Sequence, residues 1–159
     1  MTTEQMTTDE LRLNVLASPA AVGVVRDCFE RCLMRWEVAA PLRDDVILAA
    51  SELLTNAVEA APSREVHARL SRDDCGVLLE IWDPSNAMPR PEPVVELTLR
   101  DLDLTEERFD ANGGWGLPLV AALAAGYGCR PYPPNGGKTI WARFGAAASR
   151  ASAPAPRRP

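Results

Sequence analysis

The sequence is poor in the residues that build metal sites. It has a single histidine, His67, and its four cysteines include no Cys-x-x-Cys pair. A zinc site uses closely spaced cysteine and histidine ligands, so we expect none here and interpret the cysteines as free thiols. His67 has no partner at catalytic-triad spacing and lies in an alternating, strand-like run, which indicates a structural role.

Long hydrophobic runs are also missing. No stretch approaches the roughly 18 uninterrupted apolar residues of a membrane span. The first residues, Met-Thr-Thr-Glu-Gln-Met, lack the basic and apolar parts of a secretory signal. These observations predict a cytoplasmic protein that does not bind a membrane.

The chain has fewer basic residues than acidic residues. The chain has 22 acidic and 17 basic residues, and its formal net charge is −5. A nucleic-acid surface would need a basic stripe that displaces counterions, so we expect no direct nucleic-acid partner. An acidic chain meets basic protein partners more readily.

The length and composition predict one domain. With 159 residues, of which 47% are hydrophobic, the chain can bury a single core. We expect this domain at residues 10–145, after a flexible N-terminus at residues 1–9. The last residues, 146–159, are rich in Ala, Ser, Pro and Arg, a composition typical of a disordered tail.

Hydrophobic periodicity and turn residues predict the order of the elements. We expect a strand, two long helices, a strand hairpin, a long loop, a helix and two closing strands. Their predicted ranges are 10–17, 19–36, 41–61, 65–71, 76–82, 84–112 for the loop with a short helix at 94–104, then 117–125, 127–132 and 139–144. This order predicts an α+β fold, a two-layer sandwich with helices on one face of a mixed, mostly antiparallel sheet.

The second long helix carries an acid and an amide on one face. Glu52 and Asn56 are four residues apart in Ser51-Glu-Leu-Leu-Thr-Asn-Ala57, which places them about 40° apart around the helix axis. A carboxylate can deprotonate or orient a hydroxyl, and an amide oxygen suits Mg²⁺. The alternative is a solvated helix face, because this spacing alone is common.

Three further signals lie downstream. Asp83 follows a predicted strand, where a carboxylate can accept a hydrogen bond from the amine of adenine, although Asp before Pro is also an ordinary turn. Gly113, Gly114 and Gly116 open a helix, where backbone N–H groups can approach a phosphate, although glycines also form hinges. Thr139 follows Gly136-Gly137-Lys138 into the last strand, although a plain hairpin turn would look the same.

The order of these signals is more specific than any one of them. It resembles the GHKL-type ATP-binding domain, or Bergerat fold, which gyrase, heat-shock chaperones and sensor kinases share. More closely, Ser51–Ala57, Gly114–Val120 and Gly137–Ala142 are similar to stand-alone bacterial regulators typified by anti-sigma factor serine/threonine kinases. The likeness covers roughly residues 10–145.

The resemblance implies ATP and Mg²⁺ as cofactors and a role for each matching residue. Glu52 would be the catalytic base, and Asn56 would hold the metal that bridges the phosphates. Asp83 would bind the adenine amine and Thr139 would support the adenine pocket. The triphosphate would be accommodated at the start of the glycine-led helix, by Gly114, Gly116 and Leu117.

The resemblance also implies a reaction and partners. The γ-phosphoryl group would pass to a serine of a small antagonist protein, and a sigma factor would be a second partner. Homodimers are usual among such relatives. Two residues differ from the kinase pattern, because Asp-x-Gly reads Asp83-Pro84-Ser85 and a loop arginine is replaced by Asn112. A non-catalytic ATP-dependent switch and a pure interaction module therefore stay open beside the kinase.

Overall fold

The structure is a computed structural model, and it describes residues 2–7, 9–87, 116–132, 134 and 136–145. The elements in this part of the chain are, in order, β1 (Thr3–Thr7), β2 (Glu10–Leu16), α1 (Pro19–Arg35), α2 (Ala40–Ala60), β3 (Glu65–Asp73), β4 (Gly76–Asp83), α4 (Gly116–Leu123), β5 (Gly126–Pro131) and β6 (Lys138–Phe144). The expected loop at 84–112, with its short helix, and the expected tail lie mostly or wholly outside the described residues.

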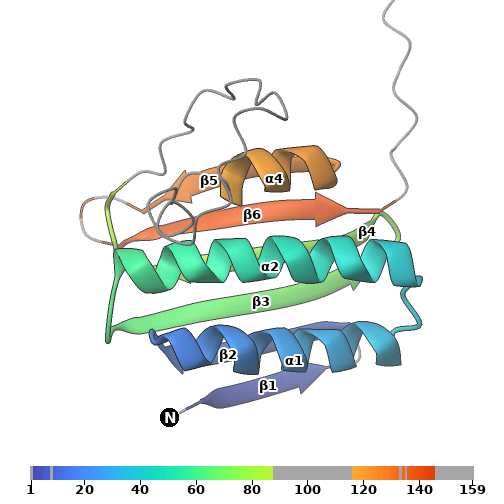
Figure 1. The fold of residues 1–159 in the computed structure, drawn as a ribbon, viewed down its shortest axis with the longest axis horizontal. Coiled ribbons are helices and arrows are strands. Elements are labelled where there is room, and N and C mark those ends of the chain that lie inside the picture. The colour runs from blue at the N-terminus through green and yellow to red at the C-terminus, as the bar shows by residue number, and fades with distance from the viewer. Residues whose placement is uncertain (1, 8, 88–115, 133, 135, 146–159) are drawn as a thin grey trace, which may run out of the picture.

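The strands form one sheet in the order β1-β2-β3-β4-β6-β5. Every pairing in it is antiparallel, which confirms the predicted fold class with no parallel pair among the described strands. The helices α1, α2 and α4 lie side by side over one face of this sheet (Figure 1). The chain is thus a two-layer α+β sandwich, as the element order predicts.

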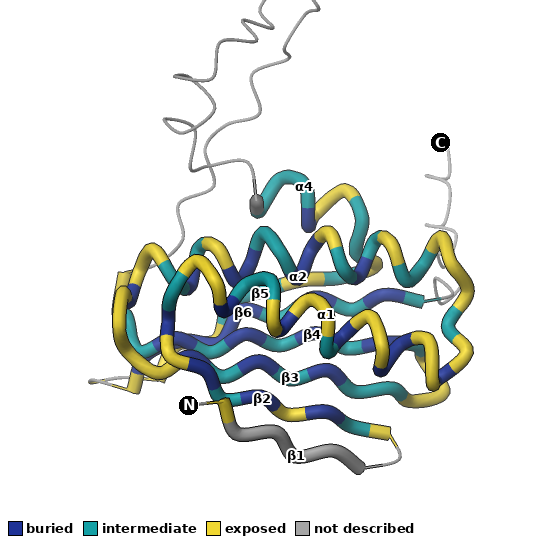
Figure 2. The backbone as a smooth tube through the Cα atoms, turned by 60° about the horizontal axis from the view of Figure 1, so that its bottom comes forward, coloured by how far each residue is buried: buried dark blue, intermediate teal, exposed yellow. Residues whose placement is uncertain are grey.

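Alternation along the strands separates a core face from an open face. Leu11, Leu13 and Val15 of β2 are buried, and Figure 2 shows buried residues alternating with more exposed ones along the central strands. Successive side chains of a strand point to opposite faces, so one set meets the helices while the other faces away from them. The buried set packs with Phe29 of α1 and Leu53 of α2 in one core.

Local signals account for the ends of the two long helices. Ser18 caps α1, because its hydroxyl accepts a hydrogen bond from the Ala21 amide, and Pro19 occupies the first turn. The turn after α1 contains Glu37 at φ 57°, a left-handed conformation that ends the helix. The second helix, α2, ends at Ala60 shortly before Pro62, which cannot continue it.

The N-terminus differs from the expectation of a flexible segment. Residues Thr3–Thr7 form β1, which pairs with β2 from Thr3 opposite Asn14 to Thr7 opposite Glu10. The segment Thr-Glu-Gln-Met-Thr has little apolar alternation, so its sequence gives no strand signal. An edge strand is held by backbone hydrogen bonds to one neighbour, and this pairing extends the domain beyond the predicted start at residue 10.

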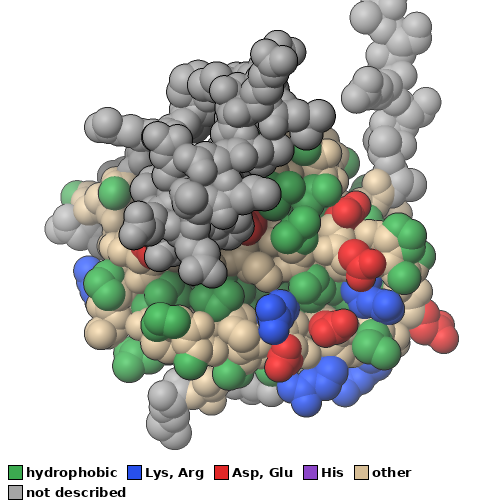
Figure 3. Space-filling view, in the orientation of Figure 1, with side chains coloured by type: hydrophobic (Ala, Val, Ile, Leu, Met, Phe, Trp, Pro, Cys, Tyr) green, Lys and Arg blue, Asp and Glu red, His purple; other side chains and the backbone are tan. Residues whose placement is uncertain are grey.

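The helical face has two distinct regions. Figure 3 shows acidic and basic side chains intermingled on one side of this face, and hydrophobic side chains are more frequent elsewhere on it. Exposed hydrophobic residues of the helices include Val24, Met34 and Leu48. None of the described helices combines the length and the apolar character that a bilayer-crossing segment needs.

Candidate functional site

A buried ion pair lies where β4 ends and β6 begins. The register pairs Asp83 directly with Lys138, and the Lys138 ammonium lies 2.9 Å from Asp83 Oδ1. Their side chains are only 2% and 5% exposed. Two charges are costly to remove from water, so such a pair persists only where its geometry and further hydrogen bonds offset that cost.

The turn after β4 supplies those further hydrogen bonds. The Ser85 amide donates to Asp83 Oδ1 at 2.9 Å, and Lys138 Nζ donates to the Ser85 carbonyl at 3.3 Å. Asp83 Oδ1 therefore accepts two hydrogen bonds, and Asp83 Oδ2 receives none from the described residues. Among those residues, the buried carboxylate keeps one oxygen that can accept a donor from a ligand.

A neighbouring thiol shares this environment. Cys129 of β5 is paired with Ile140 of β6, close to Lys138 in sequence. Burial raises the pKa of the Cys129 thiol, while the Lys138 ammonium acts in the opposite direction. The thiol is thus kept protonated and serves as a packing group, which agrees with the expected free cysteines.

The glycine turn before β6 is fixed against the end of β4. Gly137 has φ 72°, and a Cβ at this position would lie 2.1 Å from the Asp83 carbonyl oxygen. The Trp82 indole N–H donates to the Gly136 carbonyl at 2.9 Å. Only glycine combines this left-handed conformation with such a close approach, so the motif Gly136-Gly137-Lys138 sets the position of the Lys138 side chain.

The acid and the amide of α2 lie beside the buried stripe of that helix. Ala49, Leu53 and Ala57 are buried, whereas Glu52 and Asn56 are half-buried. Within the described part of the chain, neither side chain makes a hydrogen bond or an ion pair. Helix α2 packs against α4 and against β4, the strand that ends at Asp83. Glu52 and Asn56 therefore lie on the helix that adjoins both of these elements.

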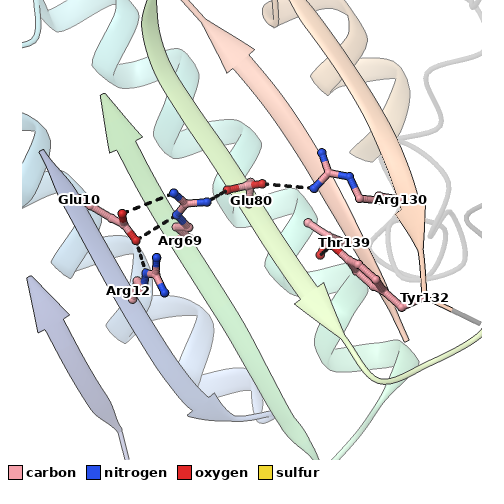
Figure 4. A network of polar contacts seen from close by, with 7 residues as sticks. All are labelled: Glu10, Arg12, Arg69, Glu80, Arg130, Tyr132 and Thr139. Carbon is pink, nitrogen blue, oxygen red and sulfur yellow. Dashed lines mark hydrogen bonds and ion pairs between the residues drawn. The ribbon is translucent and has the colours of Figure 1, made fainter. Parts of the chain in front are cut away.

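Thr139 does not join Asp83. The register pairs Thr139 with Trp82, and adjacent residues of a strand face opposite ways, so Thr139 points to the open face while Lys138 points to the core. There its hydroxyl lies 3.5 Å from that of Tyr132 (Figure 4). Thr139, and then Arg130, hold the pKa of Tyr132 below its ordinary value. Lys138 thus stands beside Asp83, and Thr139, which the sequence analysis assigns to the support of the adenine pocket, lies on the opposite face of the sheet.

The glycine-led helix is described in part. Gly116 is the first residue of α4, and Leu117 is half-buried and packs against the core. Gly114 and Asn112, which the sequence analysis singles out, lie outside the described residues. Helix α4 packs against α2, the helix that carries Glu52.

Comparison with known proteins identifies the family of this fold. The profile of the histidine kinase-like ATPase domain matches residues 15–144, most of the chain. The chain belongs to the histidine kinase-like ATPase domain family. This membership confirms the expected GHKL-type fold and implies that the domain binds a nucleotide. No curated protein matches the sequence.

A solved structure supports the same fold. A chain in the SiaB-SiaC complex from Pseudomonas aeruginosa superposes with a TM-score of 0.53 at 13% identity. The match covers 82% of this chain and 86% of the other. At that identity the likeness establishes the architecture, and the roles of individual residues have to be argued from the site itself.

Lys138 is the site residue that the sequence analysis did not single out. Its signal is visible in retrospect, because Lys138, Ile140 and Ala142 alternate on the buried face of β6. A lysine at such an inward position needs a carboxylate partner. The sequence alone does not give the register between β4 and β6, and that register makes Asp83 the partner.

Proposed function

We propose that this histidine kinase-like ATPase domain binds ATP with Mg²⁺ and acts as a regulatory protein serine/threonine kinase in partner switching. The observation that carries the proposal is the carboxylate of Asp83, 2% exposed, at the end of β4 in a chain of this family. A buried carboxylate with one oxygen left unpaired by the described residues is suited to bind the exocyclic amine of adenine.

Lys138 and Ser85 give this contact its geometry. Both donate to Asp83 Oδ1, so the carboxylate is held in one orientation before any ligand arrives. Preorganised groups bind more tightly because less ordering is needed on association. Ser85 contributes only its backbone N–H and carbonyl to these contacts, so they are compatible with a serine where the family pattern has glycine. Because Thr139 lies on the other face of the sheet, Lys138 takes the supporting role beside Asp83 in this proposal.

The α2 residues supply the chemistry in this proposal. Asn56 would provide an amide oxygen to Mg²⁺, which usually takes one or two protein ligands and completes its shell with phosphate oxygens and water. The metal would neutralise charge on the phosphates. Glu52, one helical turn away, would accept the proton of the attacking hydroxyl. Gly114, Gly116 and Leu117 would accommodate the triphosphate at the start of α4.

The partners in this proposal come from the family resemblance. By resemblance to anti-sigma factor kinases, the acceptor would be a serine of a small antagonist protein, and a sigma factor would be the regulated partner. The similar solved chain belongs to a complex, SiaB-SiaC, and a complex fits a partner-binding use of this fold. A homodimer and a cytoplasmic location belong to the same proposal.

A second candidate is a non-catalytic switch, in which the nucleotide favours one conformation and so one partner. Asn112 favours this alternative, because an amide cannot replace the bidentate positive contact of an arginine with the γ-phosphate.

Two measurements separate these candidates. Addition of ATP and Mg²⁺ should raise the thermal unfolding temperature, because a ligand that binds only the folded state stabilises it. Incubation with ATP labelled at the γ-phosphate should then label a purified antagonist-type protein. A thermal shift without transfer supports the switch, and the absence of any shift refutes both nucleotide proposals.

A further inference from the structure

The face of the sheet that the helices do not cover carries its own arrangement of side chains, here called the open face. The register aligns Arg12, Arg69, Glu80 and Trp141 in one row across the sheet, from β2 to β6. The next row is Asn14, His67, Trp82, Thr139 and Arg130, from β2 to β5. The proposed nucleotide site lies on the other face, so these rows serve no part of it.

The three arginines of the open face differ in how far internal ion pairs engage them. Arg69 is fully engaged, because it donates to Glu80 at 2.7 Å and to Glu10 at 3.0 and 3.4 Å. Arg12 donates through Nε to Glu10, and Arg130 NH1 lies 3.8 Å from Glu80 (Figure 4). Arg12 and Arg130 are 58% and 56% exposed. Each has guanidinium N–H groups that point to no carboxylate among the described residues.

Aromatic rings lie between these two arginines. The Trp82 ring stacks on His67 with centroids 4.5 Å apart, which holds the indole in place on the sheet. The Trp141 indole lies across Gly128, where a Cβ would come within 2.9 Å of Trp141 Nε1. Trp, Tyr and Arg are the residues that contribute most often to the energy of protein interfaces.

These side chains surround a hollow of about 440 Å³ on the open face. Its lining includes three arginines and one glutamate. With Glu10, which pairs with Arg12 and Arg69 beside the hollow, this group has a formal charge of +1, in a chain whose net charge is −5. The hollow is therefore a local positive site on an acidic protein. Such a site attracts a carboxylate-bearing partner over the approach distance and orients it.

We propose that the open face is a docking site for an acidic, extended segment of a partner protein. Carboxylates of the segment pair with Arg12 and Arg130, and an apolar side chain between them rests on Trp82. The backbones of Arg12 and Arg130 are four strand spacings apart, about 19 Å, which an extended chain crosses in about six residues. The segment therefore has acidic residues near both ends and an apolar residue in its centre.

The hollow favours this occupant over other classes. Small-molecule sites are mostly apolar and enclosed, whereas charged and polar side chains line most of this hollow. A nucleic acid is longer than the hollow, so its phosphates would also lie against the rest of the chain. The net negative charge of the chain would repel those phosphates.

The test uses the whole chain and the peptide Asp-Ser-Thr-Leu-Thr-Ser-Asp, with Lys-Ser-Thr-Leu-Thr-Ser-Lys as the control. Nitrogen–proton NMR spectra follow the indole N–H signals of Trp82 and Trp141, and buried Trp36 serves as an internal reference. The acidic peptide should shift the first two signals and leave Trp36 unchanged. Its affinity should fall as salt is added, because exposed charge pairs are screened.

Variants assign the contact to the two arginines. The double variant Arg12→Gln, Arg130→Gln should weaken peptide binding about tenfold, the loss expected for two exposed charge pairs. The matched control is Arg26→Gln, which removes an exposed arginine from α1 on the helical face and should leave binding unchanged. Thermal unfolding of each variant verifies that it is folded.

Several outcomes would overturn the proposal. Equal affinity for the acidic and basic peptides would show that the open face does not select acidic segments. A loss of affinity in Arg26→Gln equal to that in the double variant would show that Arg12 and Arg130 do not form the contact. Stronger shifts of Trp82 and Trp141 with a single-stranded oligothymidine would assign the face to nucleic acid. An unchanged spectrum with peptide, together with a change of sedimentation in the double variant, would assign it to a second copy of this chain.

Discussion

Lys138 and Asp83 form a directly paired, buried ion pair across β4 and β6, with 2.9 Å between Lys138 Nζ and Asp83 Oδ1. This pair joins the end of one strand to the start of another on the helix-covered face of the sheet. A carboxylate so deeply buried would be unstable without its cation, and the cation would be unstable without it. The two residues are therefore expected to behave as one unit.

Replacement of both members should cost less than the two single replacements added together. We expect Lys138→Met to lower the free energy of unfolding by about 3 kcal/mol, because Asp83 is left buried and unpaired. The double variant Lys138→Met, Asp83→Asn should lose clearly less than the sum of the two single variants. Urea denaturation of all four proteins measures this coupling, and additive losses would show that the pair is not a unit.

Gly137 should be intolerant of a side chain. Its φ of 72° and the 2.1 Å that would separate a Cβ from the Asp83 carbonyl oxygen predict that Gly137→Ala lowers stability by about 1–3 kcal/mol. Gly23 of α1 is the matched control, because nothing lies within 4 Å of its Cβ position. Gly23→Ala should stabilise the protein by about 0.5–1 kcal/mol through helix propensity. Denaturant midpoints that fall equally in both variants would contradict this account.

Replacement of Glu52 should reduce phosphoryl transfer without a comparable loss of nucleotide binding. If it is the base, Glu52→Gln keeps the shape of the side chain but cannot accept the proton, so phosphoryl transfer should fall by a factor of about 100 or more. Nucleotide affinity should stay within a few-fold of the original protein. Single-turnover assays with labelled ATP, run beside calorimetry, measure both quantities. Transfer that persists in Glu52→Gln would remove Glu52 from the reaction.

Glu10 should make the stability of the sheet dependent on pH in the acid range. The hydrogen bond from Arg12 holds the pKa of Glu10 below its ordinary value; burial opposes this effect and Arg69 reinforces it. The unfolded chain therefore takes up this proton at a higher pH than the folded chain. The stabilisation is complete above the ordinary pKa of glutamate and is lost as pH falls through the folded pKa.

The variant Glu10→Gln has no such proton to bind. Its unfolding free energy, measured in urea at a series of acidic pH values, should change less steeply with pH than that of the original protein. Arg12→Gln should reduce the slope in the same direction, because it removes the main cause of the lowered pKa. Identical slopes in all three proteins would show that the Glu10 interactions are absent in solution.

The elements that the sequence predicts are those with a strong local signal. The Ser18-Pro19 start of α1, the periodic stripe of α2 and the alternating residues of β3 and β4 specify their own conformation, and the structure places these elements within a few residues of the predicted ranges. Strand β1 has no comparable pattern, since Thr3–Thr7 is held by pairing with β2 rather than by its own periodicity.

The site is harder to predict because it depends on register. A shift of one residue moves a side chain to the other face of a sheet, and for that reason Thr139 lies on the face opposite Asp83. Asp83 is recognisable from its place after a strand. Its partner Lys138 becomes visible only when β4 and β6 are paired. The roles of Glu52 and Asn56 remain predictions from the sequence, and the Glu52→Gln assay tests the first of them.

The most direct test of the central claim is calorimetric titration of ATP with Mg²⁺ into the original protein, Asp83→Asn and Thr139→Val. The account predicts one binding event in the original protein. The affinity should be at least about tenfold weaker in Asp83→Asn, since a lost hydrogen bond to a charged group costs more than about 1.4 kcal/mol. In Thr139→Val the affinity should stay within about twofold of the original. No heat in the original protein, or a loss confined to Thr139→Val, would contradict it.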